Sequence, residues 1–253
     1  MREVVMAINQ PADLPYGGVC AWALPSDDRC AQAARTHLGH VMQTLRFDTE
    51  AVENAQLAVS ELATNAHRHV SKPRSGHPDN VSELAVWART WPVAELVVSV
   101  FDSAPQSLPH PDGGGPLAES GRGMTIVGAV TNGWGAHPSR PRLADPQLSG
   151  KAVWMAVSLP AAWPRLCAPI FPVVAAQRLA MNLAARGVRA RRTSEATGIS
   201  LVETPGLNVW VCRSTFAWTA RGGVLHRHPH IDLQETTEHV IATLERSAQR
   251  PAH

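Results

Sequence analysis

Residues 103–120, SAPQSLPHPDGGGPLAES, interrupt this chain with a stretch that cannot hold regular structure. The segment contains four prolines and three consecutive glycines, and neither residue type supports the interior of a helix or a strand. A long irregular loop inside a compact domain is usually either functional or disordered. We therefore predict a flexible cover between two ordered parts of one domain.

The segments before this loop carry clear helix and strand patterns. Apolar residues at helical spacing predict two helices, and apolar runs bounded by turn residues predict three strands. The expected helices cover 28–46 and 48–70, the second with Asp48 or Thr49 as its cap, and the expected strands cover 18–25, 81–90 and 93–102. The first strand ends at Pro25 and is expected at a sheet edge.

Regular structure resumes after the loop. An apolar helix is expected from GRGMTIVGAV to about Asn132, and strands are expected in WGAHP and in KAVWMAVSLP. The proline-broken segment AAWPRLCAP marks a boundary, after which a smaller α-β-β-β-α unit is predicted. The expected organisation is a tail over 1–17, a first domain over 18–160, a linker over 161–171 and a second domain over 172–249.

Composition limits the classes of function. A formal net charge of +2 for 253 residues is too small to indicate nucleic-acid binding, and the basic run RGVRARR (186–192) is typical of a solvated helix end. The chain has no apolar run long enough to cross a membrane and no pattern of a secretory signal, so a cytoplasmic protein is expected. Four cysteines without C-x-x-C spacing indicate neither a zinc knuckle nor a disulfide framework.

The stretch SELATNAHRHV places polar groups on one side of the second expected helix. Glu61 and Asn65 are one turn apart and share a face, opposite apolar residues such as Leu62 and Ala66. By itself this pattern fits a solvated face of an amphipathic helix. A ligand site requires further signals.

Two further signals flank the irregular loop. Asp102 ends the apolar strand VVSVFD, where a carboxylate could accept a hydrogen bond from the exocyclic amine of adenine; the ordinary alternative is a turn-initiating aspartate. Gly121 and Gly123 precede a helix, where backbone N–H groups and the helix dipole favour phosphate oxygens. The alternative for these glycines is a tight turn.

Taken in chain order, these features resemble the GHKL ATP-binding fold, and more closely the ATPase domain of bacterial anti-sigma-factor serine kinases, over roughly residues 18–160. SELATNAHRHV is similar to the N box of that family, and GRGMTIV is similar to its glycine box. The resemblance implies an α/β sandwich of the Bergerat type, with a mixed sheet covered on one face by helices. ATP and magnesium are the implied cofactors.

The resemblance also implies roles for individual residues. Asn65 would ligate the Mg²⁺ that bridges the ATP phosphates, Glu61 would act as general base on a substrate hydroxyl, and Asp102 would hold adenine. The remaining implied contacts to the nucleotide come from Arg68, His69, Gly121, Arg122, Gly123 and Met124.

The implied function is regulatory. A protein of this kind sequesters a sigma factor and phosphorylates a serine or threonine of an antagonist protein, acts without direct nucleic-acid contact, and in many relatives forms a homodimer. The Ser-Ala-Pro that follows Asp102 favours this branch, whereas Ala152 stands where the family often has a threonine beside adenine. The alternative is a non-catalytic module that uses ATP as a structural ligand or switch.

The second predicted domain offers fewer signals. HRHPH (226–230) holds three imidazoles, which fits either a metal site or, more simply, an exposed turn before the last helix. Trp210 and Trp218 lie in expected strands, and we predict that both pack into the core of this domain.

Overall fold

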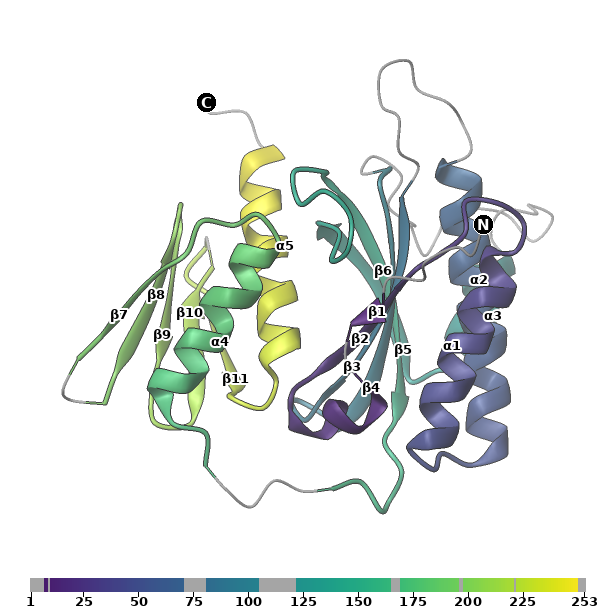
Figure 1. Ribbon diagram of the computed structural model, residues 1–253, viewed down its shortest axis with the longest axis horizontal. Coiled ribbons are helices and arrows are strands. Elements are labelled where there is room, and N and C mark those ends of the chain that lie inside the picture. Colours follow the sequence, from purple (N-terminus) through teal and green to yellow (C-terminus); the bar gives the residue numbers. More distant parts are fainter. Residues whose placement is uncertain are drawn as a thin grey trace.

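The computed structural model describes residues 7–8, 10–70, 81–104, 122–164, 169–195, 198–220 and 222–249. Its described elements form four layers (Figure 1): three helices, a six-stranded sheet, two helices and a five-stranded sheet. The outer helices are α1 (Cys30–Thr44), α2 (Thr49–Val70) and α3 (Arg122–Val130), and the central helices are α4 (Pro172–Ala185) and α5 (Leu233–Gln249). The α/β sandwich is confirmed.

The first sheet has the strand order β1-β2-β3-β4-β6-β5. Its strands are β1 (Ala7–Ile8), β2 (Val19–Ala23), β3 (Ser82–Arg89), β4 (Glu95–Asp102), β5 (Gly133–Ser139) and β6 (Gly150–Ser158). Every described pair is antiparallel, so the prediction of a mixed sheet was wrong. The chain does return in the same direction from β4 to β5 through α3, but β6 lies between them and pairs antiparallel with both.

The position of β2 also differs from the prediction. We expected an edge strand, but β1 pairs with its outer side, with Ala7 opposite Trp22. Pro25 lies beyond the last residue of β2, so its missing N–H group removes no hydrogen bond from the sheet. A six-residue 3₁₀ helix, Pro11–Tyr16, connects the two strands.

The helices α1 and α2 follow the sequence pattern closely. The Asp48 carboxylate accepts a 2.7 Å hydrogen bond from the Ala51 N–H, which is the expected cap of α2. The apolar sides of both helices are fully buried against the sheet, with Leu38, Val59 and Leu62 at 0–2% exposure. Burial of side chains of this size contributes about 1.5–3 kcal/mol each.

The second unit contains a five-stranded sheet rather than the three strands predicted. Its order is β11-β10-β9-β8-β7, with every described pair antiparallel. The strands are β7 (Arg191–Ser194), β8 (Ser200–Thr204), β9 (Leu207–Val211), β10 (Thr215–Thr219) and β11 (Leu225–Pro229). The two strands that sequence reasoning missed, β7 and β11, form the edges of this sheet.

Three expectations for single residues of this unit need correction. HRHPH is not an exposed turn, because its first four residues belong to β11 and both His228, at 6%, and His230, at 5% exposure, are buried. RGVRARR is not a wholly solvated helix end, because Arg186 is 4% exposed. Trp218 is buried as predicted, but Trp210 is 48% exposed, since successive residues of a strand point to opposite faces.

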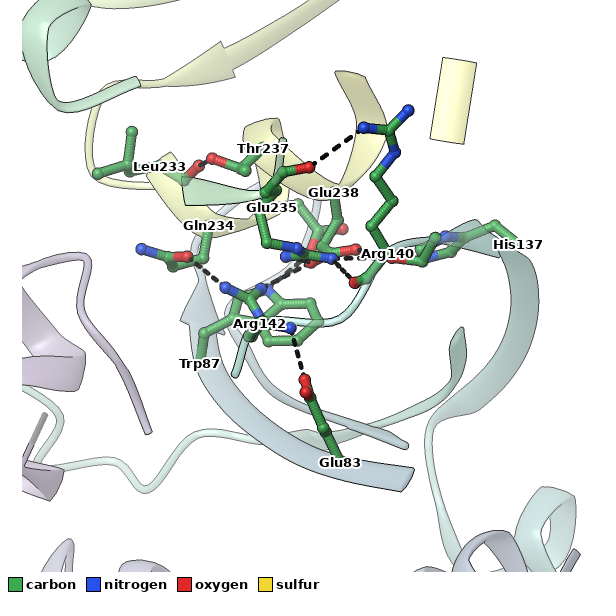
Figure 2. Close-up of polar contacts among 12 residues, drawn as sticks. Glu83, Trp87, His137, Arg140, Arg142, Leu233, Gln234, Glu235, Thr237 and Glu238 are labelled. Atoms are coloured by element: carbon green, nitrogen blue, oxygen red, sulfur yellow. Dashed lines mark hydrogen bonds and ion pairs between the residues drawn. The ribbon is translucent and has the colours of Figure 1, made fainter. Parts of the chain in front are cut away.

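The second unit covers the face of the first sheet that α1–α3 leave open. Helix α5 contacts β3 and β5, and Figure 2 shows Arg142 between Glu83 of β3 and the α5 residues Gln234 and Glu238. The Arg142 guanidinium donates to Gln234 at 3.0 Å and to Glu238 at 2.7 Å, and its backbone N–H donates to Glu83 at 2.5 Å. Arg186 adds a second ion pair to Glu238, also at 2.7 Å.

A second set of polar contacts lies nearby on β3. Glu235 of α5 accepts hydrogen bonds from the Trp87 indole and from the Arg89 guanidinium, both at 2.9 Å. The Asp232 carboxylate accepts from the backbone N–H groups of Thr90 and Trp91 at 2.8 and 2.9 Å. Because these charged groups are buried and paired, the two units are held in one defined arrangement.

In the part of the chain that the structure describes, none of the helices has the length and apolar character to cross a membrane.

Candidate nucleotide site

Helix α2 brings Glu61 and Asn65 to the side of the molecule where α3 begins. Their neighbours Leu62 and Ala66 are buried in the core, which fixes the rotation of α2 about its axis. Glu61 and Asn65 are therefore half-buried and lie next to α3. The predicted polar face is a contact between two helices and not a fully solvated surface.

Glu61 lies against Gly123 in the first turn of α3. A Cβ added to Gly123 would be only 2.6 Å from Glu61 Oε2, so glycine is required for this close approach. Helix α3 begins at Arg122, and the N–H groups of its first turn have no partner within the helix. Together with the helix dipole they attract negative charge, which here includes the Glu61 carboxylate.

Asn65 contacts the next residue of the same turn. Its Nδ2 donates a 3.8 Å hydrogen bond to the Sδ atom of Met124, and a thioether is a weak acceptor. This contact uses the amide nitrogen. The amide oxygen, which is the atom that can ligate Mg²⁺, is not engaged by it.

Asp102 lies at the end of β4 with 1% exposure. The Lys151 ammonium donates to Asp102 Oδ1 at 2.8 Å, and the backbone N–H of Ala104 donates to the same oxygen at 2.9 Å. Lys151 also donates to the Ala104 carbonyl at 3.0 Å. The carboxylate predicted to hold adenine is thus one half of a buried ion pair.

Sequence reasoning did not assign a role to Lys151. The sequence feature that could have identified Lys151 is a lone lysine at the start of the apolar strand SGKAVWMAV, in a chain with few lysines. Its pairing follows from strand register, which places Lys151 directly opposite Asp102. The next pair is Ala152 opposite Phe101, and Ala152 is 3% exposed, so no hydroxyl is supplied at that position.

Several predicted nucleotide contacts remain predictions. Arg68 lies on α2 and is exposed, whereas Gly121 lies outside the described residues. The backbones of His69 and Arg122 are described as parts of α2 and α3, but their side chains are not. The predicted cover is described only at residues 103–104.

The donor set fits a nucleotide-bound magnesium ion. Among the described residues, no group of three or more His, Cys, Asp or Glu side chains is placed to hold a metal ion. One amide oxygen, from Asn65, is available beside the first turn of α3. Mg²⁺ usually keeps several waters and is held by few protein ligands together with substrate phosphates, so Asn65 suits a metal that arrives with ATP.

Comparison with known proteins agrees with this geometry. Residues 24–140 match the family model described as the histidine kinase-like ATPase domain, a range that contains α1–α3, β3, β4 and β5. A search of curated proteins gives no match. A domain of this family implies ATP binding and typically Mg²⁺. Residues 24–140, within the first unit of this chain, therefore match a histidine kinase-like ATPase domain of the GHKL type.

Proposed function

We propose that the protein is a serine/threonine kinase of the anti-sigma-factor type, which phosphorylates a protein antagonist and thereby controls the availability of a sigma factor. The observation that supports the kinase most directly is the contact between Glu61 and Gly123. It places a carboxylate beside the helix N-terminus that would receive the ATP phosphates. A base in this position can reach a hydroxyl that approaches the γ-phosphate.

The proposed reaction is a direct phosphoryl transfer. The serine oxygen of the antagonist bonds to the γ-phosphorus, the bond from that phosphorus to the bridging oxygen of ADP breaks, and Glu61 takes the hydroxyl proton. Bound Mg²⁺ would neutralise charge on the phosphates, with Asn65 as its protein ligand. The N–H groups at the start of α3 would stabilise the transferred group.

Asp102 would accept a hydrogen bond from adenine. The ammonium of Lys151 donates to Asp102 Oδ1, which helps to fix the orientation of the carboxylate. This arrangement, together with Ala152, also suits the alternative function, a nucleotide-binding module that transfers no phosphate.

Separate measurements of binding and transfer distinguish these two functions. The purified protein is mixed with γ-labelled ATP, Mg²⁺ and candidate antagonist proteins, and ATP binding is measured by calorimetry. We expect Glu61→Gln to retain ATP binding and to lose at least about 100-fold of the transfer rate, the usual contribution of a general base. Asn65→Ala should lose the magnesium-dependent part of binding.

The matched control is Glu53→Gln, which changes an exposed carboxylate elsewhere on α2 and should leave both measurements unchanged. Nucleotide binding without transfer to any partner would replace the kinase by the binding module. A chain that binds no ATP would contradict both proposals.

A further inference from the structure

A cavity of about 780 Å³ lies between the two units, on the side of the first sheet opposite α1–α3. One wall comes from β5 and β6, and the other from α5, Ala220 and His226 of β11. The lining side chains that carry chemistry are His137, Trp154, His226, His239, Thr243 and Arg246. Small-molecule sites have volumes of this order and commonly occur between domains.

The cavity has aromatic rings on both walls. On the sheet side, the ring of Trp154 has the Arg89 guanidinium 5.2 Å from its centroid. On the other side, His226 stacks on Trp218 with 5.1 Å between ring centroids and 9° between the planes. Both rings are therefore held in place by neighbours, and both residues line the cavity, so the lining supplies aromatic groups suited to a planar ligand.

His239 of α5 is also fixed in position. Its Nε2 lies 3.4 Å from Glu235 Oε1, and its ring meets that of His226 edge to face, with 6.2 Å between centroids. Glu235 itself is held by Trp87 and Arg89 of β3. The hydrogen-bond network between the units thus preorganises the cavity, which lowers the entropic cost of binding.

The charge of the lining has one sign. Arg246 is the permanently charged group among the lining residues, and Asp and Glu are not among them. Burial lowers the pKa of His137 and of His226, so both imidazoles are neutral near pH 7 and serve as hydrogen-bonding and stacking groups. A single guanidinium without a lining carboxylate favours an anionic partner.

We propose that this cavity binds a planar aromatic molecule with one negatively charged group, in which the ring lies between the imidazole and indole walls and the anion pairs with Arg246. A metal ion is a poorer occupant, because the described residues contain no group of His, Cys, Asp or Glu with suitable geometry. The site is separate from the nucleotide site, which lies on the opposite side of the first sheet.

The test uses a pair of probes with the same shape and different charge. Indole-3-acetate is anionic at pH 7.5, whereas indole-3-acetamide is neutral, and calorimetry on the full chain measures both. We expect indole-3-acetate to bind about tenfold more tightly, the effect of one charge-assisted hydrogen bond. Benzoate and salicylate extend the test to smaller rings.

Variants connect the binding to the cavity. Arg246→Gln should weaken indole-3-acetate about tenfold and leave indole-3-acetamide unchanged, while Arg213→Gln, at an exposed arginine outside the lining, should change neither. Thr243→Trp should fill the cavity and abolish binding of both probes. Ser247→Trp, which fills the same cavity from the next turn of α5, replaces Thr243→Trp if that variant does not fold.

Two results would overturn the proposal. One is the absence of binding of all three aromatic carboxylates at millimolar concentration. The other is binding that persists unchanged in a folded cavity-filling variant, since the ligand would then occupy another part of the surface.

Discussion

Gly123 controls how closely the Glu61 carboxylate approaches helix α3. In Gly123→Ala the new methyl group would lie 2.6 Å from Glu61 Oε2, so the flexible end of Glu61 has to move. Alanine favours a helix by about 1 kcal/mol over glycine, which offsets the cost of this movement. We expect the free energy of unfolding, measured with urea, to change by less than about 1 kcal/mol, while phosphoryl transfer falls at least about tenfold.

Gly128 of the same helix provides the control. A Cβ at this position would have its nearest neighbour, Trp134 Nε1, at 3.4 Å, which is an ordinary contact distance. Gly128→Ala should therefore gain helix propensity and keep full transfer activity. Equal activity of the two variants would show that the position of Glu61 beside Gly123 does not matter for the reaction.

Lys151 and Asp102 form an ion pair in which both side chains are 1% exposed. Lys151→Met removes the positive charge and leaves a buried carboxylate without its main partner. Loss of one member of such a pair typically costs about 3–5 kcal/mol, which we expect as a decrease in the free energy of unfolding measured with urea. The double variant Lys151→Met/Asp102→Leu should recover part of the loss, because no charge then remains buried. A loss below about 1 kcal/mol for the single variant would contradict this account.

The site residues differ in how far the sequence could predict them. Glu61 and Asn65 were placed on one face by the spacing of four residues, which is a local property of a helix. The pairing of Lys151 with Asp102 depends on which strands become neighbours and in what register. Because Lys151 and Asp102 are 49 positions apart in the chain, no local sequence pattern predicts their contact.

The strand β11 carries imidazoles that make its packing sensitive to pH. Burial, with a smaller contribution from His239, lowers the pKa of His228 to about 4, so the folded protein keeps this ring neutral at pH 7. An unfolded histidine has a pKa of about 6.5. Between these two values the unfolded chain binds more protons, and stability must fall as the pH decreases from 6.5 to 4.

The expected size of this effect is about 2.5 kcal/mol for His228, measured as the difference between the free energies of unfolding at pH 7 and at pH 4.5. His228→Gln should flatten the dependence, and His40→Gln, at an exposed position of α1, should not.

Some dependence of stability on pH will remain, because burial also lowers the pKa of His137, His226 and His230. The Glu235 carboxylate, with a pKa lowered to about 2, loses its stabilising effect only below about pH 4.5. If the free energy of unfolding of His228→Gln depended on pH in the same way as that of the unchanged protein, His228 would not be the source of the pH dependence.

At the scale of elements, the sequence predicted helices better than edge strands. The helix α2 has its own cap at Asp48 and a continuous apolar side, and both signals are local. The strand β7 is exposed at all four residues and has no alternation to detect. In β11 the alternation is carried by His226 and His228, whose burial depends on the ring of Trp218 in the neighbouring strand.

The arrangement of the whole molecule rests on charged groups that the sequence did not distinguish from surface residues. Arg142, Glu83 and Glu238 come from three distant segments, and each side chain would suit a solvated position if it were considered alone. The structure brings them together under α5 (Figure 2), where Glu238 is 3% and Glu83 is 2% exposed. Their contacts depend on how the second unit packs on the first sheet, and the sequence alone did not predict that packing.

This docking predicts that the two units unfold together. The back of the first sheet has its own apolar cluster, including Val19, Trp87 and Val97, and unfolding of the second unit alone would expose the Trp87 indole and leave the Arg142 guanidinium without its α5 partners. Calorimetry should show one transition for the chain, with equal calorimetric and van't Hoff enthalpies. Two resolved transitions would mean that the network does not couple the units.

The variant Arg142→Met tests the same coupling. It retains the aliphatic part of the side chain and the backbone N–H that donates to Glu83, but it removes the guanidinium that donates to Gln234 and Glu238, so the buried Glu238 carboxylate loses one of its two arginine partners. We expect a loss of about 3–5 kcal/mol and a separation of the single transition into two, because the penalty falls on the contact between the units and not within either core. The control Arg192→Met changes an exposed arginine of β7 and should keep one transition at the original temperature. If Arg142→Met lowers the melting temperature while the transition stays single, the apolar contact beneath α5 is sufficient to couple the units, and the ion pairs contribute stability without determining cooperativity.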